Sequence, residues 1–282
     1  MEGRTSTVEE PRAVSVGILK GGVGKSTLAI NLAERLGSRG HSVLLIDVDP
    51  DGHGTFAIGF EEAYNDSVHI GDVIFDEGAT FEDIIYETDY GFDLIPSNSK
   101  LGVVESRIER AINSFTKLRD EIVRPLLGNA YDYILLDTSP QQGKLSDTAP
   151  VAAGNIIIPI NATEEVISSF EKMYAEQIHE IRKSMDLNIL AIVPNDYASR
   201  NNIEEKLVHD LANDFPDALP NFASPELIDD DDSPGPGLRH RIAFSRAFAE
   251  DKPLAQYDPE NDQIERLDEL ADIIERGGVD NE

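Results

Sequence analysis

The stretch KGGVGKST at residues 20–27 constrains the fold of this chain more than any other feature. It follows an apolar run at 13–19 and precedes a stretch of helical periodicity at 25–39. A glycine-rich turn between a strand and a helix is the context that a phosphate-binding loop requires, because its backbone N–H groups and the helix N-terminus converge on phosphate oxygens. The usual pattern, G-x-x-x-x-G-K-[ST], would place a glycine where Leu19 stands, and Lys20 follows it. We interpret Leu19 as the end of the strand and predict a P-loop with a second lysine at its mouth.

The residues of this loop have distinct expected roles. Its glycines let the backbone curl around phosphate groups. Lys25 is expected to reach the β- and γ-phosphates of a nucleotide, and the Ser26 hydroxyl to ligate Mg²⁺. The expected nucleotide-binding residues are Gly21, Gly22, Val23, Gly24, Lys25, Ser26 and Thr27, with Asn195 as a candidate contact to the adenine.

Three aspartates are expected to face this loop. Asp47 and Asp49 end the apolar run at 42–48, and Asp137 ends the run at 131–137. In open α/β sheets ligands lie beyond the carboxyl ends of the strands, so these carboxylates are candidates for a Mg²⁺ and phosphate site. Taken singly, each could instead cap the end of its strand.

Short apolar runs alternate with longer segments of helical periodicity, which predicts an α/β fold with a largely parallel sheet. We predict a single-domain P-loop NTPase over residues 13–276, with a doubly wound, mostly parallel sheet flanked by helices. Residues 1–12 and 277–282 are expected to be tails, the first of them disordered, and the acidic segment 229–237 an exposed loop. Expected strands are 13–19, 42–48, 92–97, 131–137, 155–160 and 188–194, and expected helices are 25–39, 100–127, 163–184, 201–213 and 262–276.

The composition is strongly acidic, with 54 aspartates and glutamates against 24 lysines and arginines and a net charge of -30 over 282 residues. The acids occur in every segment, which favours adaptation to a high-salt cytoplasm over an ordinary solvated surface, because at about 1 M salt the Debye length is only ~3 Å. Cysteine is absent, which excludes disulfides and thiolate metal sites. No apolar run approaches the roughly 18 residues of a membrane span, and the first dozen residues lack the core of a signal peptide, so we expect a soluble cytoplasmic protein.

Several motifs together resemble the ParA/Soj branch of the deviant Walker A ATPases, a family related to MinD and to nitrogenase iron protein. KGGVGKST is similar to the deviant loop, and YDYILLDTSP at 131–140 resembles the family's second aspartate motif. LLIDVDPDGHGT at 44–55 resembles D-x-D-P-Q-G-N-A-T, with Asp51 and His53 where the family usually has Gln and Asn. Ser139 stands where a first proline is usual, and Gln141-Gln142 follow. Two further similar segments are FDLIPSNSKLGVVE at 92–105 and RIAFSRAFAEDKPLAQYDP at 241–259.

The resemblance implies a Mg²⁺-dependent, weak ATPase. It implies that Lys20 reaches across an ATP-bound sandwich homodimer to the partner subunit's phosphates and that Asp49 positions or activates the attacking water. Asp47 and Asp137 would hold Mg²⁺ through its waters. The implied function is nonspecific DNA binding, with nucleoid association in the ATP state, that moves a plasmid, a chromosome or another cargo. A ParB-like or other small adaptor protein is the implied partner.

Other relatives fit less well. Iron-protein relatives need cysteine ligands, and MinD-like membrane cycling needs a basic amphipathic helix at the C-terminus. The segment 262–276 carries six acids and two arginines, so we expect it to pack on the domain and not on a membrane.

DNA binding rests on a few candidate residues, which are Arg239, Arg241, Arg246 and Arg200. They could equally be ordinary surface charge, and the net charge of -30 opposes a polyanion. The alternative is therefore a nucleotide-switched scaffold that positions a protein complex without binding DNA.

Overall fold

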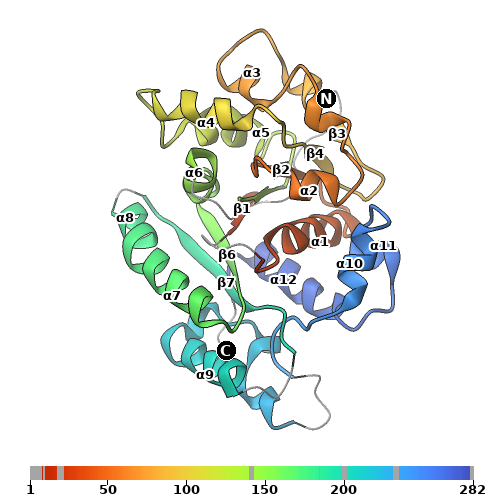
Figure 1. Ribbon diagram of the computed structural model, residues 1–282, viewed down its shortest axis with the longest axis vertical. Coiled ribbons are helices and arrows are strands. Elements are labelled where there is room, and N and C mark those ends of the chain that lie inside the picture. The colour runs from red at the N-terminus through yellow and green to blue at the C-terminus, as the bar shows by residue number, and fades with distance from the viewer. Residues whose placement is uncertain are drawn as a thin grey trace.

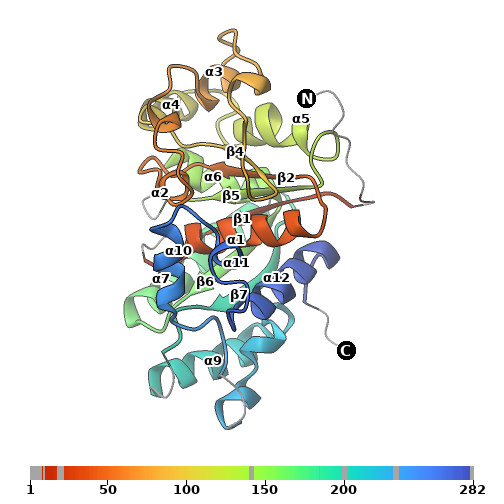
Figure 2. The ribbon, with the colours of Figure 1, turned by 90° about the vertical axis from the view of Figure 1, so that its right-hand side faces the viewer.

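A seven-stranded sheet forms the centre of the molecule in the computed structural model, which describes residues 8, 10–17, 22–139, 143–183, 185–198, 202–230 and 235–279 (Figures 1 and 2). The strand order is β3-β4-β2-β5-β1-β6-β7, and all neighbours are parallel except β3 and β4. The strands are β1 Arg12–Val16, β2 Val43–Asp47, β3 Tyr86–Glu87, β4 Asp93–Ile95, β5 Tyr133–Asp137, β6 Asn155–Ile160 and β7 Asn188–Pro194. The predicted doubly wound α/β class is confirmed.

Helices cover both faces of the sheet, as continuous apolar strands require. The α-helices are α1 Lys25–Ser38, α2 His53–Phe56, α3 Ile70–Ile74, α4 Leu101–Glu109, α5 Arg124–Leu126, α6 Lys144–Ala153, α7 Glu164–Met173, α8 His179–Arg182, α9 Asn202–Asp214, α10 Ile242–Phe248, α11 Leu254–Tyr257 and α12 Ile264–Arg276. Figures 1 and 2 both place α3 and α4 at one end of the long axis and α9 at the other.

Alternate residues of β2 divide the core into two layers. Val43 and Leu45 belong to an apolar cluster that includes residues of α1 and α12, whereas Leu44 and Ile46 belong to a second cluster with residues of α4 and α6. This division follows from the two-residue period of a strand, which points successive side chains to opposite faces. The sheet is therefore buried on both sides, and the ends of its strands are the places where polar side chains can gather.

The long helix predicted over 100–127 is wrong. The chain forms α4, then turns through residues 110–116, and resumes as a π-helical stretch at Arg119–Val123 followed by α5. Asn113 and Ser114 lie in the interruption, and such residues favour turns because their side chains compete for backbone hydrogen bonds. The helix predicted over 163–184 exists as α7 and α8, joined by a π-helical stretch at Tyr174–Ile178.

The acidic loop at 229–237 is exposed only in part. Asp229 and Asp230 are exposed, but Pro236 and Gly237 are buried. The guanidinium of Arg266, on α12, donates to the carbonyls of Gly235 and Gly237 and holds this end of the loop against the domain. The exposed-loop prediction therefore fails at its glycine-rich end.

Helix α12 packs on α1, in agreement with the expectation that the segment 262–276 packs on the domain. Leu267, Leu270 and Ile274 are fully buried or nearly so, and Arg39 beyond the end of α1 pairs with carboxylates of α12. Within the residues that the structure describes, no helix has both the length and the apolar character needed to cross a membrane.

Candidate nucleotide-binding and hydrolysis site

The glycine loop connects β1 to α1 at the carboxyl end of the sheet. Gly22 and Gly24 have φ of 76° and 86°, a backbone region that favours glycine. Gly24 is the N-cap of α1, and a side chain at this position would also clash with the amide of Asn195. Lys20 and Gly21, predicted to belong to the loop, lie outside the described residues.

Asn195 supports the loop from the end of β7. Its Nδ2 donates a hydrogen bond of 2.7 Å to the carbonyl of Val23, and its own backbone N–H donates to the carbonyl of Ile160. The side chain thus fixes the position of the loop backbone. The sequence suggested Asn195 only as an adenine contact, whereas the structure gives it this bracing role as well.

A cavity of about 360 Å³ opens beside the start of α1. Lys25, Ser26, Asp49 and His53 are among the residues that line it. Burial lowers the pKa of Lys25 to about 8, although the nearby Asp137 and Asp49 carboxylates favour its charged form. The cavity therefore combines a buried cation with a helix N-terminus, which together suit a polyphosphate.

Asp47 and Asp137 are aligned on the neighbouring strands β2 and β5, where they are register partners. Asp47 Oδ2 accepts hydrogen bonds from Thr55 N and Thr55 Oγ1, each of 2.7 Å. Neither carboxylate oxygen of the fully buried Asp137 makes a well-formed hydrogen bond, although Ser26 lies close enough to favour its charged form. Burial raises the pKa of Asp47 to about 6 and, together with the Asp47 charge, raises the pKa of Asp137 well above its usual value.

These two carboxylates and the Ser26 hydroxyl fit a Mg²⁺ site. Hard divalent cations prefer oxygen ligands, and a buried carboxylate without a partner needs a compensating positive charge. Thr55, which the sequence did not single out as a site residue, orients Asp47 toward this position.

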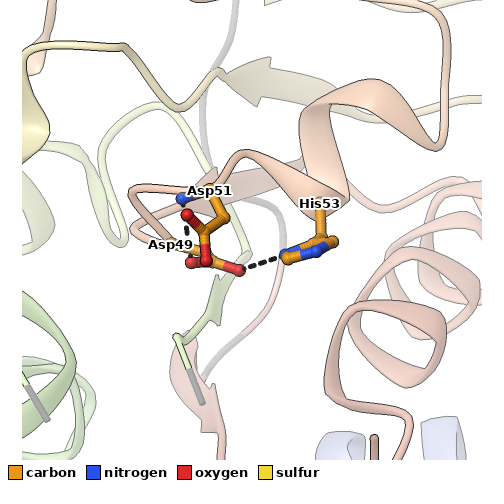
Figure 3. A group of neighbouring side chains, drawn as sticks. All are labelled: Asp49, Asp51 and His53. Atoms are coloured by element: carbon orange, nitrogen blue, oxygen red, sulfur yellow. Dashed lines mark hydrogen bonds and ion pairs between the residues drawn. The ribbon is translucent and has the colours of Figure 1, made fainter. Parts of the chain in front are cut away.

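Asp49 lies in the loop between β2 and α2 and uses both carboxylate oxygens (Figure 3). Oδ1 accepts from the backbone N–H of Asp51 at 3.1 Å, and Oδ2 lies 2.8 Å from Nδ1 of His53. Ser97 Oγ donates to the Asp49 carbonyl and so fixes the loop to the end of β4. The sequence marked His53 only as a departure from the family pattern. Its four-residue spacing from Asp49 was the available signal for this pair.

A second cavity, of about 240 Å³, shares Gly22, Gly24 and Thr27 with the first. Its wall includes Thr27, Asn195, Arg239 and Arg241. Two of the residues predicted to bind DNA, Arg239 and Arg241, therefore line a cavity beside the loop. Arg241 also forms an ion pair with Asp262. Arg246 is exposed on α10, and Arg200 lies outside the described residues. The predicted basic cluster is therefore not one surface, because Arg239 and Arg241 line a cavity and Arg246 is exposed elsewhere on α10.

The fold and this site define a nucleotide-binding P-loop ATPase. A model of the AAA domain family matches residues 11–192, more than half of the chain. The chain belongs to this family and, within it, to the ParA/MinD superfamily of ATPases.

Two curated relatives illustrate the sequence similarity. The chromosome-partitioning ATPase Soj of Thermus thermophilus is 31% identical over 206 residues, which cover 72% of this chain and 77% of Soj. The chromosome partitioning protein ParA of Caulobacter vibrioides is 27% identical over 249 residues, which cover 88% of this chain and 87% of ParA.

Two solved structures illustrate the similarity of the fold. An ATP complex of a single-substitution variant of Cyanothece McdA has a TM-score of 0.77 at 19% identity, and the match covers 98% of this chain and 99% of McdA. A plasmid partition protein of Borrelia burgdorferi bound to AMPPNP has a TM-score of 0.73 at 22% identity, with coverage of 95% and 100%. At these identities the structures support the fold alone.

Proposed function

We propose that this chain is a partitioning or positioning ATPase that is switched by ATP binding and hydrolysis. Its ATP-bound sandwich homodimer binds DNA without sequence preference, and a ParB-like or other small partner stimulates hydrolysis and releases it. The cargo is a plasmid or a chromosome. The family membership and the curated relatives named for chromosome partitioning support this proposal.

One observation carries the nucleotide part of the proposal. The buried Lys25 ammonium lies at the start of α1 and interacts electrostatically with the buried Asp137 carboxylate, whose register partner on β2 is the buried Asp47. Buried charges of both signs at one helix N-terminus are costly to fold without ligands, and they are the groups that bind a phosphate chain and a cation.

Mg²⁺ fits this site, with Ser26, Asp47 and Asp137 as the residues that would hold it, directly or through waters. When bound, it neutralises charge on the phosphate oxygens. Lys25 binds and orients the phosphate chain, and Asp49, which lines the same cavity, acts on the attacking water either directly or through a neighbouring side chain.

The dimer part of the proposal depends on Lys20, which the resemblance assigns to the partner subunit's phosphates. We expect Lys20→Ala to bind ATP but to remain monomeric in light scattering with ATP and Mg²⁺. Lys25→Ala should lose ATP binding itself and serves as the comparison. Dimerisation of Lys20→Ala at the wild-type ATP concentration would contradict the cross-subunit role.

Nonspecific DNA binding is tested by fluorescence anisotropy with random duplex DNA, with and without ATP, over a series of KCl concentrations. Phosphate contacts weaken steeply as salt rises, so the series separates them from other contacts. Arg246→Ala should weaken ATP-dependent binding, and Arg110→Ala, an exposed arginine just after α4, is the matched control. Binding that is equal in the two variants would remove Arg246 from the interface.

A second candidate function is a nucleotide-switched scaffold that does not bind DNA. It is favoured by the fact that Arg241 is neutralised by Asp262 and lines a cavity with Arg239, in a chain with a net charge of -30. The absence of ATP-dependent DNA binding at every salt concentration, in a protein that still dimerises with ATP, would select this function.

A further inference from the structure

We propose that His53 accepts the proton of the water that attacks the γ-phosphate, while Asp49 holds its imidazole ring. The resemblance assigns water activation to Asp49 alone. The inference rests on ATP hydrolysis at the glycine loop, as proposed above, and concerns which side chain takes the proton.

Both carboxylate oxygens of Asp49 already have a polar partner. One accepts the Asp51 N–H and the other is 2.8 Å from His53 Nδ1, while the Asp49 side chain is only 1% exposed. In contrast, the His53 side chain is 62% exposed, and it is the first residue of α2. Of this pair, the imidazole is therefore by far the more accessible to a water molecule, and Figure 3 shows it beside the Asp49 carboxylate.

His53 lies in the wall of the phosphate cavity. Lys25, Ser26 and Thr27 at the start of α1 line the same cavity of about 360 Å³. A carboxylate next to Nδ1 favours the tautomer that carries the proton on Nδ1, which leaves Nε2 as the acceptor nitrogen. A nucleotide whose terminal phosphate lies against Lys25 would thus have a basic nitrogen on the same wall.

In this step His53 acts as a general base, and the buried carboxylate of Asp49 orients its ring. The water oxygen forms a bond to the γ-phosphorus as the bond from that phosphorus to the β–γ bridging oxygen breaks. The proton passes from the water to Nε2 of His53. The carboxylate of Asp49 holds the resulting imidazolium through Nδ1, and the proton then passes to the solvent.

A metal ion at this cluster is the competing interpretation. Ligand atoms of Asp49, Asp51 and His53 lie within 4.8 Å of one another. Two of these residues are exposed, however, and among the described residues no further histidine, cysteine, aspartate or glutamate belongs to the group. We therefore assign the cluster to proton transfer.

The test compares the full-length wild type with His53→Ala and His53→Asn in ATPase assays at saturating MgATP, with ATP affinity measured separately. Asparagine can still donate to Asp49 but offers no basic nitrogen. We expect kcat to fall about 100-fold in both variants, in line with loss of general base catalysis, with little change in ATP affinity. Added imidazole should restore a large part of kcat in His53→Ala and have no effect on the wild type.

His41→Asn is the matched control. Nε2 of His41 is also paired with a carboxylate, at 2.7 Å from Oε1 of Glu275, but His41 precedes β2 and so lies at the amino-terminal end of the strands, away from the cavity. Its kcat should equal that of the wild type. Full kcat in His53→Asn, or a loss in His53→Ala that imidazole does not restore, would overturn the inference. A wild type that binds no ATP would instead contradict the proposed function, so the two failures are distinguishable.

Discussion

Asp47 and Asp137 face the same small space at the ends of β2 and β5, and Gly54 lies against both. A methyl group added to Gly54 would lie 2.7 Å from Asp137 Oδ2 and 3.1 Å from Asp47 Oδ2. Two buried carboxylates this close repel each other, and both have raised pKa values. This repulsion lowers the stability of the folded, nucleotide-free protein.

Replacing Asp137 by asparagine should separate stability from function. We expect Asp137→Asn to stabilise the nucleotide-free protein by about 1–3 kcal/mol, because it removes a buried charge without a hydrogen-bond partner. The additional thermal stabilisation by MgATP should be lost. Thermal unfolding with and without MgATP measures both effects.

Asp132→Asn is the control for Asp137→Asn, because Asp132 directly precedes β5, the strand that Asp137 ends. Asp132 is also fully buried, but its oxygens accept hydrogen bonds from Ser42 N and Val8 N. We expect this variant to be less stable than the wild type. Destabilisation of the nucleotide-free protein by both substitutions would contradict the electrostatic argument for Asp137.

The stability of the nucleotide-free protein should depend on pH through Asp47. Its pKa in the folded state, about 6, is raised above the ordinary value of 3.8 mainly by burial. The folded state therefore binds more protons than the unfolded state between these values, so this contribution to stability is full below pH 3.8 and is lost as the pH rises through about 6. The unfolding free energy of Asp47→Asn relative to the wild type should rise over that range. A pH-independent difference would refute the assignment.

Gly24→Ala should impair nucleotide binding as well as stability. Gly24 and Gly40 both have positive φ, but an added Cβ meets the Asn195 amide at Gly24 and nothing within 4 Å at Gly40. Both alanine variants should lose about 1–2 kcal/mol from backbone strain. Calorimetric titration with ATP should show weaker binding only in Gly24→Ala, and equal affinities in the two variants would argue against the loop geometry.

The thermal stability of the chain should increase with KCl up to molar concentrations. With a net charge of -30, screening reduces the mutual repulsion of the surface carboxylates. Melting temperatures in KCl, compared with those in sucrose as an uncharged additive, measure the effect. A melting temperature that falls steadily with KCl would contradict adaptation to high salt.

The strand-end aspartates were predictable because apolar runs fix the strands, and the carboxyl ends of parallel strands meet at one edge of the sheet. Asp47 and Asp137 are therefore neighbours at this edge, and Lys25 lies close enough to Asp137 to interact with its charge. The pairing of His53 with Asp49 had only its four-residue spacing as a signal, and that spacing is weak because the composition of this segment favours a loop, whereas residues 53–56 form a helical turn.

Interactions between distant segments were also hidden in the sequence. Arg241 and Asp262 are 21 residues apart, and no periodicity connects them, so Arg241 looked like a free surface charge. The break after α4 depends on how residues 110–116 turn back toward the domain, which local propensity indicates only weakly.

Arg266 holds the end of the 229–237 loop beside a part of the chain that the family match does not cover. Arg239 and Arg241, in the wall of the second cavity, lie beyond residue 192, where the family match ends, whereas Lys25, Asp47 and Asp137 lie inside it. The buried guanidinium ties that wall to α12 through the carbonyls of Gly235 and Gly237. The two cavities share Gly22, Gly24 and Thr27, and the wall that Arg239 and Arg241 form lies beyond the family match. Substitution in that wall can therefore change selectivity while the residues that bind phosphate stay the same.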